Sequence, residues 1–170
     1  MRILLLAREP YGPAQLGLDD LEAVESTTLI RSTDALETAV AESRPTVIVI
    51  DVRFPDEAGI TAIEDVRLWA KEAPVLALTS SPAPPDEVAL ATRAGAQGFV
   101  EVDSPPAEVA TALRALDRGE AWLPPDETRA VLTSVAGDLD TTRAERRSRL
   151  TGIVIALIPL AGVMAAILSL

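Results

Sequence analysis

Residues 46–51 read TVIVID and residues 74–79 read PVLALT, and these two runs decide the fold class. Each is a short apolar run that ends in a polar side chain, Asp51 or Thr79, as expected for a strand buried on both faces of a parallel sheet. Residues 2–7, 27–32 and 98–101 are three further strand candidates. Longer amphipathic segments separate the five runs. The sequence therefore predicts an α/β domain with a doubly wound, five-stranded parallel sheet in the order 2-1-3-4-5.

Four amphipathic segments are candidate helices, at residues 33–43, 60–71, 85–94 and 105–118. Each places apolar side chains at helical spacing on one side, so packing is their expected role. Residues 13–23 form a further candidate that is poorly defined, because Gly17 interrupts it. In a doubly wound sheet, ligands bind beyond the carboxyl ends of the strands, beside the point where the strand order reverses. Chemistry is therefore expected just past the strands, at residues 7–9, 51, 79–80 and 101–103.

The composition excludes several classes of function. The chain has 15 Lys and Arg, 26 Asp and Glu, and neither Cys nor His. Thiol chemistry, disulfides, the usual zinc sites and a Ser-His-Asp triad are all excluded. A net charge of −11 argues against binding of nucleic acid, which needs a basic face. No metal site and no catalytic group is predicted from the composition.

The charge is distributed unevenly along the chain. Residues 1–142 carry 11 basic and 25 acidic side chains, whereas residues 143–170 carry four Arg and one Glu. The 21 residues from Leu150 to Leu170 have no charge, and a helix of that length spans about 30 Å, the thickness of a bilayer core. They are predicted to form one C-terminal transmembrane helix. A buried helix that docks on another subunit is the alternative.

The basic residues before this segment set its predicted orientation. Positive side chains stay on the cytoplasmic side of a span, so residues 1–149 are expected in the cytoplasm, with a single-pass tail anchor in the cell membrane. The same cluster can contact anionic lipid. Its members are Arg143, Arg146, Arg147 and Arg149. The predicted organisation is a domain of residues 1–137, a polar and basic linker of residues 138–149, and the anchor of residues 150–170.

Three stretches resemble a bacterial response-regulator receiver domain. They are VIVIDVRFPDEAG around Asp51, PVLALTS around Thr79 and ATRAGAQGFVEVDSPPAEV from Ala91 onward. The later stretch RALDRGEAWLPP is similar to the extension found in the subgroup that usually carries a helix-turn-helix domain. Here the predicted anchor stands in place of that DNA-binding half. The resemblance covers about residues 1–130 and implies a role in two-component signal transduction.

The resemblance assigns roles to particular positions, and several of them depart from the family pattern. Asp51 stands at the phosphoacceptor position, Thr79 at the hydroxyl that reports phosphorylation, and Phe99 at the rotating aromatic. The acidic pair that follows the first strand in the family is replaced by Ala7 and Arg8. The Lys that follows the fifth strand is replaced by Val102.

These departures remove the cations that phosphoryl transfer to a carboxylate requires. Mg²⁺ prefers oxygen ligands, and phosphoryl transfer depends on positive charge at the phosphoryl oxygens. Phosphorylation that depends on Mg²⁺ is therefore expected to be severely impaired, and no cofactor is expected. Two interpretations of Arg8 stand about equal: it pairs with Asp51 and locks the domain in one state, or it points to solvent.

The favoured functional hypothesis is a membrane-anchored pseudo-receiver, which signals through protein–protein interaction and is not an enzyme. The resemblance places the partner-binding region between about Pro85 and Arg118, and it allows a homodimer. A working phosphorelay receiver, with Mg²⁺ and phosphate on Asp51, is the first alternative. A structural subunit of a membrane complex is the second.

Overall fold

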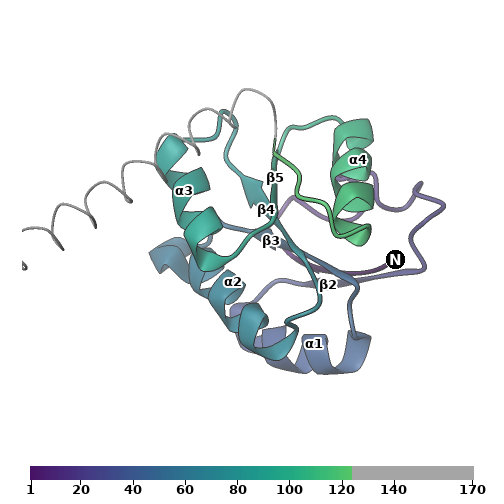
Figure 1. Cartoon of the computed structure of the whole chain (residues 1–170), viewed down its shortest axis with the longest axis horizontal. Coiled ribbons are helices and arrows are strands. Elements are labelled where there is room, and N and C mark those ends of the chain that lie inside the picture. The colour runs from purple at the N-terminus through teal and green to yellow at the C-terminus, as the bar shows by residue number, and fades with distance from the viewer. Residues whose placement is uncertain (124–170) are drawn as a thin grey trace, which may run out of the picture. The chain divides into compact units, whose positions relative to one another are not determined.

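The computed structural model describes residues 1–123, and the expected linker and C-terminal anchor lie outside the described residues, as does the end of the expected domain. Within residues 1–123, no helix is long and apolar enough to cross a membrane. Five parallel strands form one sheet in the order β2-β1-β3-β4-β5, which confirms the predicted topology (Figure 1). The strands are β1 (Arg2–Leu6), β2 (Ser26–Ile30), β3 (Val47–Asp51), β4 (Val75–Thr79) and β5 (Gly98–Glu101).

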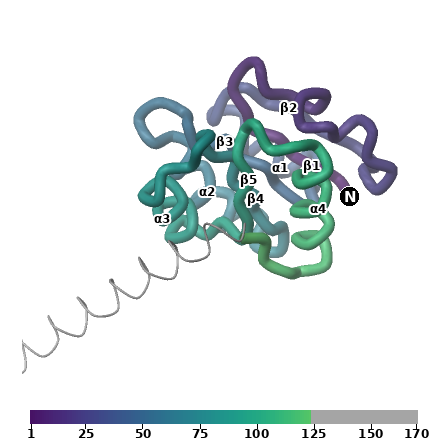
Figure 2. The backbone as a smooth tube through the Cα atoms, turned by 90° about the horizontal axis from the view of Figure 1, so that it is seen from above, coloured from purple at the N-terminus to yellow at the C-terminus, as the bar shows by residue number. Residues whose placement is uncertain are grey.

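Helices cover both faces of the sheet. Within residues 1–123 they are α1 (Leu36–Ser43), α2 (Ala58–Trp69), α3 (Pro85–Ala94) and α4 (Pro106–Asp117). Short 3-10 turns at Thr33–Ala35 and Pro55–Glu57 lead into α1 and α2. One buried cluster joins α1, α2 and α3 to the side chains on one face of the sheet. A second cluster joins α4 to the other face. Figure 2 shows α2 and α3 on one side of the central strands and α4 on the other.

The two central strands are buried throughout, as their apolar sequences predict. Every residue of β3 and β4 is buried, including the polar end residues Asp51 and Thr79. The strand register brings the carboxyl ends to one edge, since Leu6 lies beside Ile50, Asp51 beside Leu78, and Thr79 beside Glu101. The functional positions that were assigned from sequence therefore gather at this edge.

The segment between β1 and β2 departs from the expectation of a helix at residues 13–23. It forms turns, and it is held on the α4 side of the sheet by the buried side chains of Leu16 and Leu18. Gly17 has φ +66°, and a Cβ placed there would lie 2.5 Å from Cβ of Pro106. A regular helix would require a different backbone at Gly17, so packing against α4 prevents it.

Gly59, in the first turn of α2, allows this helix to approach β3 closely. A Cβ at this position would lie 2.5 Å from the carbonyl oxygen of Asp51 and 2.7 Å from Cα of Val52. Any other residue would push the start of α2 away from the end of the strand. Close contact with the backbone of Asp51 and Val52 thus explains why a glycine ends the stretch VIVIDVRFPDEAG.

The chain continues along β5 after α4. The amide of Phe99 donates to the carbonyl of Trp122 at 3.1 Å, and the amide of Trp122 donates to the carbonyl of Gln97 at 3.0 Å. The half-buried Trp122 side chain packs on the cluster beneath α4. Residues 121–123 therefore cover part of the outer edge of β5, which would otherwise expose unpaired backbone groups.

Candidate functional site

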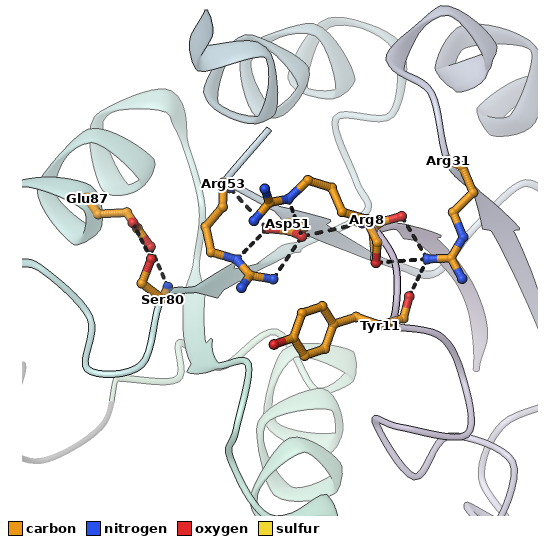
Figure 3. Close-up of polar contacts among 8 residues, drawn as sticks. Arg8, Tyr11, Arg31, Asp51, Arg53, Ser80 and Glu87 are labelled. Carbon is orange, nitrogen blue, oxygen red and sulfur yellow. Dashed lines mark hydrogen bonds and ion pairs between the residues drawn. The ribbon is translucent and has the colours of Figure 1, made fainter. Parts of the chain in front are cut away.

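The candidate site is centred on Asp51, the last residue of β3, whose side chain is 0% exposed. A buried carboxylate needs hydrogen bonds and opposite charge to remain ionised. Two arginines meet this need from opposite sides, as Figure 3 shows. We call Asp51, Arg53 and Arg8 the Asp51 site.

Arg53 is the closest partner of Asp51. Its Nε lies 2.8 Å from Oδ1 and its Nη2 lies 2.9 Å from Oδ2, so the guanidinium holds both carboxylate oxygens. The Arg53 amide also donates to Oδ1 at 3.0 Å. Residues 52 and 53 form a turn directly after β3, and this turn brings the Arg53 side chain back onto the Asp51 carboxylate. Such two-point pairs are among the strongest ionic contacts in proteins.

Arg8 reaches the same carboxylate from the end of β1. Its Nε lies 3.3 Å from Oδ2, and its amide lies 3.4 Å from the same atom. The Arg8 side chain is 38% exposed, against 15% for Arg53. Arg8 therefore points toward Asp51, as the locking hypothesis requires. Its contact with the carboxylate is longer than that of Arg53, and its side chain is more exposed to solvent.

Tyr11 and Arg31 support this arrangement from outside. The Cζ atom of Arg53 stands 4.6 Å from the centre of the Tyr11 ring, a distance typical of a cation–π contact. The Nη1 group of Arg31 donates to the carbonyls of Ala7 and Arg8, each at 2.9 Å, and also to the carbonyl of Tyr11. Arg31 thus fixes the turn that presents both Arg8 and Tyr11.

The protonation of the site follows from these contacts. Burial alone would raise the pKa of Asp51, but the hydrogen bonds and charge of Arg53, with the Arg8 amide, hold the pKa below its ordinary value of 3.8. Burial lowers the pKa of Arg53, and the bonds to Asp51 and the contact with Tyr11 outweigh it, so that pKa is raised. At neutral pH the site therefore holds one negative and two positive charges.

This charge distribution is unfavourable for a divalent cation. The described residues contain no group of three or more acidic side chains placed to hold a metal ion. Ala7 offers no side-chain ligand, and Arg8 places a positive charge beside the only buried carboxylate of the described part. A cation of charge +2 would have to displace at least one guanidinium.

The other positions singled out from sequence lie on β4, on β5 and immediately after β5. Thr79 is 0% exposed, and its Oγ1 donates to the carbonyl of Val100 at 3.2 Å. Phe99 is 1% exposed and lies in the cluster with Val88 and Ala91 of α3. Val102 is buried in the cluster beneath α4, so no side-chain cation stands at its position. Among the described residues, the side-chain hydrogen bonds of Asp51 go to Arg8 and Arg53, and Thr79 is not one of its hydrogen-bond partners.

Sequence reasoning did not identify Arg53, Arg31 or Tyr11 as parts of the site. For Arg53 the signal was its position two residues after Asp51, although residues 52 and 53 lie in a turn after β3 and not in the strand. Arg31 carried a weaker signal as the residue just after β2. Nothing local in the sequence indicates that the Tyr11 ring reaches Arg53, because the turn that carries it depends on packing.

The comparisons with known proteins agree with this architecture. The family model of the response regulator receiver domain matches residues 16–114. A LuxR-family two-component response regulator from Aurantimonas sp. SI85-9A1 is 25% identical, with a TM-score of 0.66, over 79% of this chain and 97% of that chain. No curated protein matches the chain.

Two further solved structures share the fold at lower identity. The receiver domain of the stress response regulator RcsB from Escherichia coli is 21% identical, with a TM-score of 0.64, over 73% of this chain and 98% of that chain. The signal receiver domain of the putative response regulator NarL from Mycobacterium tuberculosis is 23% identical, with a TM-score of 0.60, over 70% and 97%.

Proposed function

We propose that this chain, which belongs to the response regulator receiver family, is a pseudo-receiver: it signals by binding another protein, with its Asp51 kept in a permanent ion pair. The observation that carries the proposal is the bidentate contact of Arg53 with the buried Asp51 carboxylate, at 2.8 and 2.9 Å. Family membership supports a place in two-component signalling. Two parts of the proposal go beyond family membership: the loss of phosphorylation and the membrane anchor.

The contacts of Asp51 argue against its use as a nucleophile. Oδ1 accepts from the amide and Nε of Arg53, while Oδ2 accepts from Nη2 of Arg53 and faces Arg8. A phosphorus atom that approached either oxygen would have to displace a guanidinium from a buried site. The lowered pKa of Asp51 also makes its carboxylate a weaker nucleophile.

The surroundings also lack the charges that stabilise the transferred group. Phosphoryl transfer needs mobile or free positive charge at the phosphoryl oxygens. Here the positive charge of Arg53 is committed to Asp51, and Val102 offers an apolar side chain. The site is thus suited to holding one conformation and poorly suited to turnover, so we propose no enzymatic activity and no cofactor.

The proposed partner surface is formed by α3, β5 and α4, between Pro85 and Arg118. Its role rests on the family resemblance, which also allows a homodimer through this face. We propose further that the segment from Leu150 to Leu170 anchors the chain in the cell membrane, with the receiver domain in the cytoplasm. The basic cluster from Arg143 to Arg149 would contact anionic lipid, and no nucleic acid partner is proposed.

The test is chemical phosphorylation of the full chain in detergent micelles, with acetyl phosphate and Mg²⁺, followed by intact mass spectrometry. We expect no phosphoryl adduct on the wild-type chain. A variant with Ala7→Asp, Arg8→Asp, Arg53→Ala and Val102→Lys frees the carboxylate and restores both cation positions, so it is expected to gain an adduct.

A wild-type adduct that is lost in Asp51→Asn would overturn the proposal and establish the phosphorelay alternative. Circular dichroism of each variant shows whether the fold is retained. Stoichiometric co-purification with a membrane protein, lost when the C-terminal segment is exchanged for an unrelated span, would support the structural-subunit alternative.

A further inference from the structure

The loop of residues 80–84, between β4 and α3, is held by two carboxylates from different elements. Glu87, in the first turn of α3, accepts from the Ser80 amide at 2.6 Å and from Ser80 Oγ at 2.9 Å. Figure 3 shows Glu87 folded back onto Ser80. One side chain thus closes the start of the loop onto the helix that follows it.

The second carboxylate comes from the end of β5. Glu101 accepts from Ser81 Oγ at 2.7 Å and from the Ala83 amide at 3.0 Å. Four hydrogen bonds to ionised groups therefore act on three residues of one short loop. Bonds of this kind are shorter and stronger than those between neutral groups, and a loop so held has fewer accessible conformations.

The loop follows Thr79 directly, and it connects to the face proposed for partner binding. The Thr79 hydroxyl is satisfied by the Val100 carbonyl, and Phe99 is packed beneath α3. The residues before the loop and the helix after it are therefore fixed as well. No interaction of the described part links Glu87 or Glu101 to Asp51, Arg8 or Arg53.

From these contacts we infer that Glu87 and Glu101 form a clamp, which fixes the loop of residues 80–84 and the adjoining face of α3 and β5 whatever the state of Asp51. The partner would then meet one preformed surface. The role of this surface in partner binding rests on the proposed function, whereas the clamp itself rests on the four hydrogen bonds. Neither carboxylate belongs to the Asp51 site.

Hydrogen–deuterium exchange of the full chain in detergent micelles tests the clamp. In Glu87→Gln and Glu101→Gln the negative charge is lost, and an amide nitrogen that can only donate replaces one acceptor oxygen. The charge-assisted bond to each backbone amide becomes a weaker neutral one, and each serine hydroxyl must turn from donor to acceptor. We expect the exchange of the peptide that spans residues 78–88 to be about tenfold faster or more in each variant, with β3 peptides unchanged. Glu64→Gln, at an exposed position of α2 without a described side-chain hydrogen bond, is the matched control and should behave as wild type.

Unchanged exchange of residues 78–88 in both Gln variants would overturn the clamp. If a Gln variant does not fold, Ser81→Ala removes only one bond to Glu101 and must still speed the exchange. A separate arm adds beryllofluoride and Mg²⁺ to the wild type. A change in this loop that Asp51→Asn abolishes would refute the proposed function and the independence of the loop from Asp51. The comparison of Glu and Gln variants alone decides whether the two carboxylates hold the loop.

Discussion

Two arginines face Asp51, but they stabilise its buried carboxylate unequally. Arg53 makes two short bonds to the carboxylate and its side chain is 15% exposed, whereas Arg8 makes one contact at 3.3 Å and is 38% exposed. An ion pair loses strength as water gains access to it, and a buried charge left without its partner is costly. The pairing that matters most is therefore between residues two positions apart in the sequence.

Replacement of each arginine should show this difference. Arg53→Ala is expected to lower the free energy of unfolding by about 3 kcal/mol or more, because it leaves a buried carboxylate whose remaining ionic partner is the longer Arg8 contact. Arg8→Ala is expected to lower it by about 1 kcal/mol or less. Urea unfolding followed by tryptophan fluorescence measures both values. Equal losses would contradict the assignment of Arg53 as the principal partner.

The ionisation of Asp51 predicts a pH dependence of stability. Its pKa in the folded chain lies below 3.8, so the unfolded chain binds the proton more readily. The stabilisation is complete well above pH 3.8 and is lost as the pH falls through the folded-state pKa. As the pH falls from neutrality to values below 3.8, the wild type should therefore lose more unfolding free energy than Asp51→Asn does. Parallel acid denaturation curves for the two proteins would count against the ion pair.

Much of the residue-scale picture could be predicted, since Asp51 and Thr79 end apolar runs and therefore had to lie at the carboxyl edge of the sheet. Arg8 was a candidate partner because it follows the neighbouring strand. The principal partner was missed, because Arg53 lies in the turn after β3, where the strand pattern no longer indicates which way a side chain points. The contacts of Tyr11 and Arg31 depend on how a turn packs, which local sequence does not specify.

At the scale of elements, the close approach of α2 to β3 places the Asp51 site. A Cβ at Gly59 would meet backbone atoms at 2.5 and 2.7 Å, and backbone cannot move aside as a flexible side chain can. Gly59→Ala is expected to cost about 3 kcal/mol of unfolding free energy through overpacking. Thermal or urea unfolding measures the loss.

Gly119→Ala is the control for this prediction. Gly119 has φ +77°, but a Cβ there meets nothing within 4 Å, so its substitution carries the conformational cost alone, about 1 kcal/mol. If Gly59→Ala cost no more than Gly119→Ala, steric contact with β3 would not be the reason for the glycine.

The elements themselves were predicted well where periodicity was strong. The five strands and the helices α1 to α4 lie within a few residues of their predicted ranges. The exception is the segment between β1 and β2, where a poorly defined helix was expected at residues 13–23. Gly17 adopts a positive φ against Pro106, and this tertiary contact overrides the local pattern.

For the whole molecule, the sequence divides into an acidic part and an apolar end. The described residues form an α/β domain, and the segment from Leu150 to Leu170 lies outside them. We predict that the full chain sediments with membranes and is released by detergent but not by alkaline carbonate, because 21 uncharged residues favour the bilayer core. A chain that ends at residue 149 should appear in the supernatant. Release of the full chain by carbonate would contradict the anchor.

We propose that the guanidinium groups of Arg53 and Arg8 take the position beside Asp51 that a metal cation would need. Titration of the ¹⁵N-labelled full chain in micelles with millimolar MgCl₂, followed through the backbone amides of Arg8 and Arg53, tests it most directly. We predict no saturable shift in the wild type, because Mg²⁺ would have to displace a bound guanidinium. We predict a saturable shift in the variant with Ala7→Asp, Arg8→Asp and Arg53→Ala, followed at residues 8 and 53. Saturable, Asp51-dependent binding of Mg²⁺ by the wild type would contradict the account.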